Sequence, residues 1–328
     1  MILIVVEHAA LVPRKSAYEL VSAGRALAEA SGAPLAALVA GDAGADAVAN
    51  ALADYVADVH LVSDARLDPP RSETMTRAVA YAVTTLGARI VLLPGSRLGQ
   101  SYGPRVALRL GGAYLENVGS LAPEGEALVA KRPTYLSRFN ANVEVNAPAI
   151  VVSLSLGAAP VAQPAESAQG GAKGRVHALE VPFEREDERL EVSPRPAAAR
   201  RRVALEDAEI VVCGGRGLGS AEAFERQVVA FADRLGAGVG VTRAVVDEGW
   251  RPFDELIGQT GKTVAPKLFV ALGISGAAHF VSGMNRSGVI VAVNTDAEAP
   301  IFKVSDYGIV GDALEVCPAL EEALPAIE

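Results

Sequence analysis

A glycine-rich loop with one arginine is the first feature of the sequence that suggests a chemical role. Residues 214–219 read Gly-Gly-Arg-Gly-Leu-Gly and separate an apolar run, Ile210–Cys213, from a helical pattern that follows Ser220. Glycines let a backbone approach a phosphate group, and the N-terminus of the next helix attracts anions. The spacing is not GxGxxG, so a tight strand-to-helix turn is an equally good interpretation of the glycines. Arg216 favours a nucleotide site, because a guanidinium pairs well with a diphosphate.

Two further loops carry small and polar residues. Residues 257–263, Ile-Gly-Gln-Thr-Gly-Lys-Thr, end like a phosphate-binding P-loop, but Leu256 stands where that motif requires glycine. We therefore interpret them as a polar loop that offers a hydroxyl, an amide and backbone N–H groups to a planar heterocycle. Residues 273–280 follow the apolar run Leu268–Leu272 and begin with small side chains, an arrangement that again suits a diphosphate.

The elements that must position these loops alternate between strands and helices. In the first half, the pattern predicts strands at Ile2–Val6, Ala33–Ala40, Val59–Val62 and Arg89–Leu93, and helices at Ser16–Ala30, Ala45–Ala53, Thr74–Leu86 and through Pro104–Leu110. This alternation predicts an α/β domain with a parallel sheet covered on both faces. Three later β-rich runs, at residues 128–130, 143–145 and 150–152, are expected to be added strands that complete the first domain.

Composition marks the boundary between two domains. Residues 157–174 are predicted to be a flexible loop, residues 176–181 a short strand, and residues 184–191 a charged, solvated surface. Residues 193–196, Ser-Pro-Arg-Pro, are predicted to be a linker. We therefore expect an N-terminal α/β domain at 1–192 and a C-terminal, doubly wound parallel sheet at 197–328. Its predicted elements are strands at Ile210–Cys213, Leu268–Leu272 and Val289–Val293, and a helix at Ala221–Leu235 capped by Ser220.

Charge and composition exclude several classes of function. The formal net charge is −9 and the pI is about 5.1, so nucleic acid is not an expected partner. No stretch of about 18 uncharged apolar residues predicts a membrane span, and no basic leader precedes Ile2–Val6, so we expect a cytoplasmic protein. Cys213 and Cys317 form no CxxC motif and are expected to be buried, reduced thiols. The histidines form no metal-ligand set, and no catalytic triad is apparent.

Residues from about 210 to 318 resemble the FAD-binding domain of electron-transfer flavoprotein α subunits. The resemblance rests on ordered blocks of matching residues at 214–218, 240–243, 246–250, 258–268, 273–277, 298–302 and 306–310, together with Asn294. The first half of the chain resembles the family more loosely, through its alternation of strands and helices and its opening Val5-Val6-Glu7-His8.

The resemblance implies roles for particular residues. Arg216 is expected near the FAD diphosphate, Thr242 and Arg243 beside the flavin ring, and the Thr260 hydroxyl toward flavin N5. Asn294 and Asp312 are expected on the adenosine side. The complete set of expected cofactor-binding residues is Arg216, Thr242, Arg243, Ile257, Gly258, Gln259, Thr260, Ser275, Gly276, Ala277, Ala278, His279, Phe280, Asn294, Asp312 and Ala313. Among them, Arg243, Thr260 and His279 are expected to tune the flavin, and no residue is assigned as catalytic.

The sequence departs from the family pattern at two places. Thr242 stands where the family usually has serine, a change that keeps the hydroxyl. His279-Phe280 stands where the family usually has Gln-His, and that histidine contacts the pyrimidine side of the flavin. Since a phenylalanine donates no hydrogen bond, three interpretations stay open. His279 takes over the role, the flavin has a different potential, or His279 only caps its helix.

The function that the resemblance implies is electron transfer rather than chemistry on a small substrate. The chain would bind FAD, and its first domain would pack against a β subunit that carries AMP or a second FAD. Electrons would come from a flavoprotein dehydrogenase and pass to a quinone oxidoreductase or another acceptor. Three alternatives remain: a subunit of an electron-bifurcating flavoprotein that oxidises NADH through a second FAD, a stand-alone FAD- or NAD-dependent enzyme, and a nucleotide-binding regulatory module with the first domain as sensor.

Overall fold

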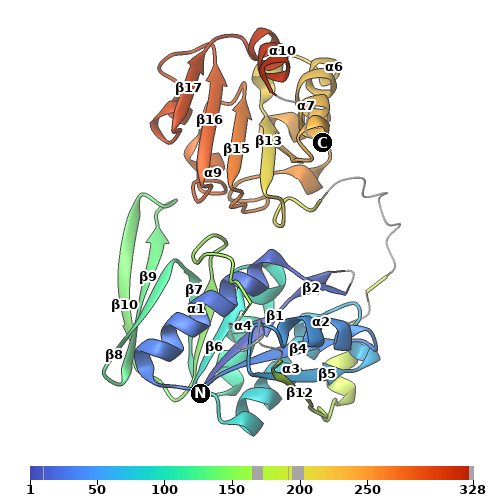
Figure 1. Cartoon of the computed structure of the whole chain (residues 1–328), viewed down its shortest axis with the longest axis vertical. Coiled ribbons are helices and arrows are strands. Elements are labelled where there is room, and N and C mark those ends of the chain that lie inside the picture. Colours follow the sequence, from blue (N-terminus) through green and yellow to red (C-terminus); the bar gives the residue numbers. More distant parts are fainter. Residues whose placement is uncertain (10, 165–172, 191, 194–202, 325–328) are drawn as a thin grey trace. The chain divides into compact units, whose positions relative to one another are not determined.

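Seven strands between residues 2 and 178 form one parallel sheet, in the order β12-β5-β4-β1-β6-β11-β7 (Figure 1). The computed structural model describes residues 1–9, 11–164, 173–190, 192–193 and 203–324. The strands are β1 (Ile2–Val6), β4 (Leu35–Gly41), β5 (Asp58–Ser63), β6 (Ile90–Pro94), β7 (Ala113–Val118), β11 (Ile150–Leu154) and β12 (Arg175–Ala178). Every residue of β1 and β11 is buried, as expected for strands covered on both faces.

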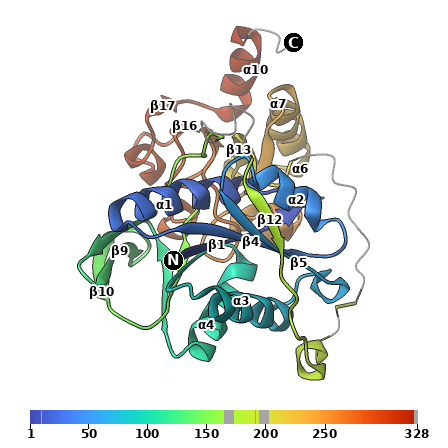
Figure 2. The ribbon, with the colours of Figure 1, turned by 60° about the horizontal axis from the view of Figure 1, so that its bottom comes forward.

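Two helices cover each face of this sheet (Figure 2). α1 (Lys15–Ser31) and α2 (Ala45–Leu52) pack over the side chains of Ile2 and Ile4. α3 (Ser72–Leu86) and α4 (Arg97–Arg109) pack over Leu3 and Val5 on the opposite face. α1 and α3 end at glycines with positive φ, which is the commonest way to terminate a helix. None of the helices in the described residues combines the length and hydropathy that crossing a bilayer requires.

The later β-rich runs divide between two sheets. β8 (Ser120–Glu124), β9 (Ala127–Thr134) and β10 (Phe139–Val145) form a separate antiparallel sheet in the order β10-β9-β8, whereas β11 enters the parallel sheet between β6 and β7. The predicted added strands are therefore present, but they belong to two different sheets. A short hairpin of β2 (His8–Ala9) and β3 (Val12–Pro13) completes the strands of this part of the chain that the structure describes.

The charged run at 184–191 is not simply a solvated surface, which corrects the prediction. Residues Arg185–Glu188 form a 3-10 turn in which Asp187 is only 2% exposed. The Arg77 guanidinium of α3 donates to Asp187 at 2.9 Å and pairs with Glu184 at 2.9 Å. The segment therefore lies against α3, and two of its carboxylates pair with Arg77. Residue 191 lies outside the described residues, as do 165–172 of the predicted loop and 194–196 of the predicted linker.

The second half of the chain forms a five-stranded parallel sheet in the order β14-β13-β15-β16-β17. Contacts along the chain divide it into two units, Met1–Arg195 and Pro196–Glu328. The strands of the second unit are β13 (Ile210–Gly214), β14 (Gly238–Val241), β15 (Leu268–Leu272), β16 (Val289–Asn294) and β17 (Tyr307–Val310). The α/β fold class with parallel sheets is confirmed, and β14 and β17 are additions to the predicted elements.

The helices of the second unit cover its sheet unequally. The predicted helix after Ser220 is observed as α6 (Ala221–Phe224), a π-helical turn at Glu225–Val229 and α7 (Ala230–Arg234). Ser220 caps it, since its hydroxyl accepts a hydrogen bond from Ala223 N. Together with α10 (Ala313–Ala323) these helices pack over one face of the sheet. The other face is covered mainly by loops and by α9 (Ala278–Val281), while the short helix α8 (Arg243–Asp247) follows β14.

Candidate functional site

The carboxyl ends of the strands of the second unit surround a cavity of about 780 Å³. Gly215 follows β13, Thr242 follows β14, Gly273 follows β15 and Asn294 ends β16. Parallel strands bring these ends to one edge of the sheet, which is where ligands bind in open α/β folds. The structure brings every expected cofactor-binding residue except Ala278 into the wall of this cavity.

Several further lining residues were not assigned individually to the cofactor, although some belong to the loops 214–219 and 273–280 that the sequence had suggested. They are Gly215, Gly217, Ala244, Leu256, Gly273, Ile274, Thr295 and Gly311. Most adjoin a strand end or a residue that was expected, so their positions relative to the strands were the available signal. Leu256 and Ile274 are buried and give the cavity an apolar wall. A mostly apolar wall with a few placed polar groups is typical of cofactor sites.

The glycines of the loop 214–219 allow it to contact the loop that follows β15. Gly215 N donates to Leu272 O at 2.9 Å, and Gly217 N donates to Gly273 O at 3.1 Å. A Cβ atom added to Gly215 would lie 2.3 Å from Gly273 O. Glycine is therefore required at position 215 because the loops after β13 and β15 touch there. Arg216, in the 3-10 turn Arg216–Leu218, is left exposed at the cavity.

Two arginines supply the positive charge of the cavity wall. Within the part of the chain that the structure describes, no hydrogen bond or ion pair engages the Arg216 side chain. Arg243 begins α8, and its Nε donates to Asp247 Oδ1 at 2.7 Å. That pair is more than half exposed, so most of its Coulomb energy is screened by water. Asp247 therefore restrains the Arg243 side chain, while the terminal guanidinium nitrogens remain available to a ligand.

The polar loop at 257–263 packs directly against α9. Gly258 adopts a φ of +133°, and a Cβ atom there would lie 2.8 Å from His279 O. Gln259 N donates to that same carbonyl at 2.8 Å. Phe280 is only 7% exposed, and its ring lies 6.2 Å from the ring of Phe269 in an edge-on arrangement. Phe280 is thus mainly a core residue that also borders the cavity.

Asn294 and Asp312 are both engaged in local structure. The Asn294 amide donates to Ile274 O at 2.8 Å, and its oxygen accepts from Asp296 N at 2.9 Å. Asp312 caps α10 by accepting a hydrogen bond from Leu314 N at 2.9 Å. Each side chain borders the cavity while fixing a turn. Each therefore has fewer hydrogen-bonding positions left for a ligand.

Behind the polar loop, an arginine bridges two elements. Arg251 donates twice to the Glu255 carboxylate, at 2.6 and 2.7 Å, and also pairs with Glu225 of the π-helical turn. Its hydrogen bond to Glu255 raises the pKa of the Arg251 guanidinium. This bridge fixes residues 251–255, which lead into Leu256 and the polar loop.

The two thiols are buried and free, as expected. Burial raises the pKa of Cys213 well above its ordinary value and raises that of Cys317 to about 12. Neither thiol therefore forms a nucleophilic thiolate near neutral pH. Among the described residues, no group of three or more His, Cys, Asp or Glu side chains is placed to hold a metal ion.

Two of the histidines lie side by side in the first unit. The rings of His60 and His177 stack at 5.2 Å, because β5 and β12 pair with these residues in register. His177 also contacts Asp58 at 2.8 Å. Desolvation, followed by the neighbouring His177, lowers the pKa of His60. The two histidines meet because β12 pairs with β5. The sequence pattern of a strand does not reveal which strand it pairs with.

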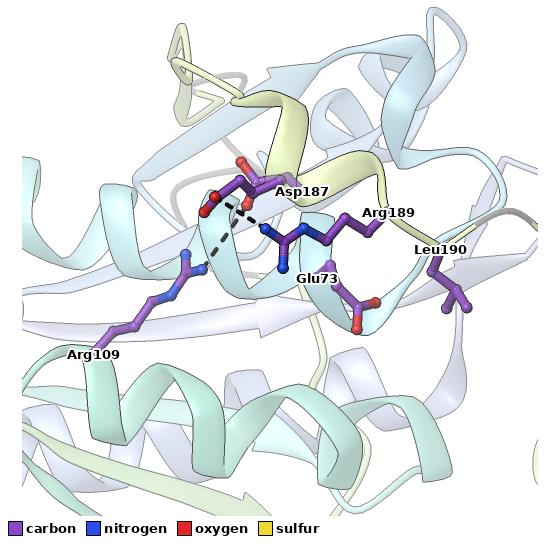
Figure 3. Close-up of a pocket in the computed structure, with 6 residues that line it drawn as sticks. Glu73, Arg109, Asp187, Arg189 and Leu190 are labelled. Atoms are coloured by element: carbon purple, nitrogen blue, oxygen red, sulfur yellow. Dashed lines mark hydrogen bonds and ion pairs between the residues drawn. The ribbon is translucent and has the colours of Figure 1, made fainter.

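A second cavity, of about 430 Å³, lies in the first unit between α3, α4 and the charged segment (Figure 3). Glu73, Arg109, Asp187 and Arg189 line it. Asp187 already accepts from Arg77 and from Glu184 N, and Arg189 pairs with Glu186 at 3.1 Å. These charges compensate one another, so the cavity resembles a structural ion-pair network more than a ligand site.

Comparison with known proteins matches one family model to part of each unit. Residues 2–184 match the model of the electron transfer flavoprotein domain, and residues 204–285 match that of the electron transfer flavoprotein FAD-binding domain. The electron transfer flavoprotein subunit alpha of Mycobacterium tuberculosis (strain ATCC 25618 / H37Rv) is 40% identical over 332 residues, covering 99% of this chain and 98% of that protein.

The chain belongs to the electron transfer flavoprotein alpha subunit family. Its counterpart in Mycobacterium leprae (strain TN) is 37% identical over 331 residues, covering 99% of this chain and 98% of that protein. Protein FixB of Bradyrhizobium diazoefficiens (strain JCM 10833 / BCRC 13528 / IAM 13628 / NBRC 14792 / USDA 110) is 36% identical over 314 residues, covering 94% of this chain and 84% of that protein. The resemblance inferred from the sequence is therefore confirmed. The cavity of the second unit lies mostly within the FAD-binding match, with Asn294 and Asp312 beyond its last residue, 285.

Proposed function

We propose that this chain holds FAD in the cavity of its second unit and carries electrons as the α subunit of a heterodimeric electron-transfer flavoprotein. The observation that carries the proposal is the convergence of the FAD-binding family residues on one cavity at the carboxyl edge of the second sheet. When bound, FAD supplies the electron chemistry, and the protein supplies binding, orientation and electrostatics.

The chemistry of the cavity wall fits an extended ligand with an anionic centre. Its volume, about 780 Å³, lies within the range typical of cofactor sites. Arg216 offers a guanidinium with no protein partner among the described residues, which suits a diphosphate. Ser275, Gly276 and Ala277 follow β15 and border the cavity with small side chains, which leave the backbone accessible to phosphate oxygens.

The remaining residues suit the two ends of the cofactor. We assign Thr242, Arg243 and Thr260 to the flavin ring, where Arg243 favours negative charge on the reduced ring. Ile257, Gly258 and Gln259 would border the ring. We assign Asn294, Asp312 and Ala313 to the adenosine side, where an amide and a carboxylate suit ribose hydroxyls and adenine nitrogens.

An electron carrier agrees better with the cavity than a stand-alone enzyme does. Among the lining residues, Asp312 and His279 carry the side chains of the types most often used for general acid–base catalysis. Asp312 caps α10, and His279 is hydrogen-bonded to Gln259. General acid–base catalysis requires a group directed at the substrate, and both of these are engaged elsewhere.

The proposal includes partners. A β subunit, with AMP or a second FAD, would pack against the first unit. The electron donor would be a flavoprotein dehydrogenase, and the acceptor a quinone oxidoreductase or another protein, in the cytoplasm. If the β subunit holds a second FAD and oxidises NADH, the complex is instead electron-bifurcating. The nucleotide-binding loops of the neighbouring β-subunit gene distinguish these two functions.

Cofactor analysis of the co-purified heterodimer tests the proposal. We expect a yellow protein that releases FAD, and no FMN, from this subunit when the complex is denatured and analysed by mass spectrometry. A complex reconstituted from the two subunits that stays colourless after incubation with FAD would contradict the proposal.

A further inference from the structure

Two elements that line the cavity are joined twice by the same pair of residues. Gln259, in the polar loop, donates its backbone N–H to His279 O at 2.8 Å. The His279 imidazole, in α9, returns the contact from Nδ1–H to Gln259 Oε1 at 2.6 Å. The two residues are 20 positions apart in sequence. We call this pair of hydrogen bonds the Gln259–His279 clasp.

Backbone packing below the clasp leaves little freedom. A Cβ atom on Gly283 would lie 2.5 Å from Gly258 N, so the two backbones are in contact. Val264 N also donates to Gly283 O at 2.8 Å. Gly258 at the start of the polar loop and Val264 just after it therefore both contact Gly283, in the turn that follows α9, and the exposed clasp joins the loop to α9 itself.

Phe280 directs its neighbour toward the loop. Its ring is held in the core against Phe269 and is only 7% exposed. Successive residues of a helix point about 100° apart. With Phe280 facing inward, His279 is at the rim, where Gln259 meets it. Thr260 follows Gln259 directly, so whatever fixes Gln259 also restrains the Thr260 hydroxyl.

We propose that His279 is a positioning residue, which acts on the cofactor through Gln259 by holding the loop 257–261, and thereby Thr260, in its binding conformation. The inference rests on the proposed FAD function. It assigns His279 a role other than direct donor to the flavin. The Nδ1–H group is committed to Gln259, and in a neutral imidazole the other nitrogen, Nε2, is then an acceptor.

Four variants of the full chain, prepared with its β subunit, test the proposal by FAD titration. His279→Leu and Gln259→Leu each remove the side-chain hydrogen bond and should weaken FAD binding by about three- to tenfold. The double variant should bind no worse than either single variant, since both remove one interaction. His279→Asn places an amide nitrogen near the position of Nδ1 and should recover most of the affinity.

Hydrogen exchange in the FAD-free complex gives a readout that does not depend on the cofactor. Loss of the clasp should speed exchange of the Gln259 amide in His279→Leu, and His279→Asn should restore its protection. A direct flavin contact would leave this exchange rate unchanged.

Each other outcome has a definite meaning. If the losses in His279→Leu and Gln259→Leu multiply in the double variant, or His279→Asn binds as weakly as His279→Leu, His279 acts independently of Gln259 and the inference is wrong. If the wild type binds FAD and all variants match it, the inference fails while the proposed function stands. If the wild type binds no FAD, the proposed function fails, and hydrogen exchange still decides whether the clasp exists.

Discussion

At the scale of single residues, the proposed function gives Arg243 a role in setting the flavin potential. Arg243 borders the cavity, and Asp247 holds it through Nε. A cation beside the flavin stabilises the reduced, negatively charged ring more than the oxidised one. The effect is limited by exposure, since the Arg243 side chain is 60% exposed.

Arg243→Ala should therefore lower the flavin potential. We expect the reduced flavin to lose about 1–2 kcal/mol of stabilisation, which lowers the potential of a two-electron couple by about 20–40 mV. Spectroelectrochemistry on the FAD-loaded heterodimer measures it, and Arg243→Lys is the matched control that retains the charge. An unchanged potential with full FAD content in Arg243→Ala would show that Arg243 has a packing or phosphate-binding role.

Position 280 gives a second prediction at this scale. Phe280 borders the cavity with an apolar ring, at the position where the family resemblance implies a histidine that contacts the flavin. The double change His279→Gln with Phe280→His should raise the potential by about 30–60 mV, corresponding to a charge-assisted hydrogen bond of about 1.5–3 kcal/mol. His279→Gln alone is the control and should not raise it. Because position 280 is buried, we also expect a lower melting temperature in the double variant. Equal potentials in the double variant and the wild type would show that another group already supplies the donor.

At the scale of elements, the first unit depends on a charged segment that is partly buried. Asp187 is 2% exposed and accepts hydrogen bonds from Arg77 Nε and Glu184 N. The 3-10 turn Arg185–Glu188 is thereby fixed to α3. Mutation of a solvated carboxylate would leave the stability of the protein unchanged. Removal of the buried Asp187 carboxylate instead takes the acceptor away from two hydrogen-bond donors.

Asp187→Ala should lower the free energy of unfolding by about 2–3 kcal/mol, since Arg77 keeps only its exposed partner Glu184. Urea denaturation measures the change. Glu186→Ala, whose side chain is 70% exposed in its ion pair, is the control and should stay within about 0.5 kcal/mol of the wild type. Equal losses in the two variants would contradict the role assigned to Asp187.

Sequence patterns predicted the buried strands better than the exposed ones. β1, β4 and β15 are continuous apolar runs, because parallel strands covered on both faces need no polar residues. β17 has mostly exposed residues and β8 includes Pro123, so neither gives that signal. The pairing of strands into two separate sheets depends on contacts distant in sequence, which periodicity does not report.

The expected members of the cavity came largely from the family resemblance, which did not reveal their contacts. The glycines at 214–219 predicted a loop, whereas the contact of Gly215 with the loop after β15 required the sheet. His279 was expected at the site, yet its hydrogen bond to Gln259 depends on how α9 meets the polar loop. The burial of Asp187 depends likewise on α3.

At the scale of the whole molecule, the proposed function requires a second chain. The sequence is 50% hydrophobic, and several large apolar side chains remain exposed, including Leu108 at 81% and Tyr135 at 80%. Since single exposed apolar side chains are common on monomers, the case for a partner rests on the family rather than on these residues.

Expressed without its β subunit, the chain should aggregate or bind FAD weakly. Light scattering and cofactor content measure this, and the co-expressed heterodimer is the control. A stable monomer with tightly bound FAD would count against an obligate partner.

The most direct test of the central claim is a titration of FAD into the cofactor-free heterodimer with and without Arg216. Arg216 borders the cavity and has no protein partner among the described residues, so its charge is available to a diphosphate. Arg216→Glu should weaken FAD binding by about 100-fold or more, because a favourable charge becomes repulsive. Arg226→Glu reverses an exposed charge outside the cavity and should bind FAD like the wild type. Equal affinities in the wild type and Arg216→Glu would contradict the assignment of this cavity to FAD.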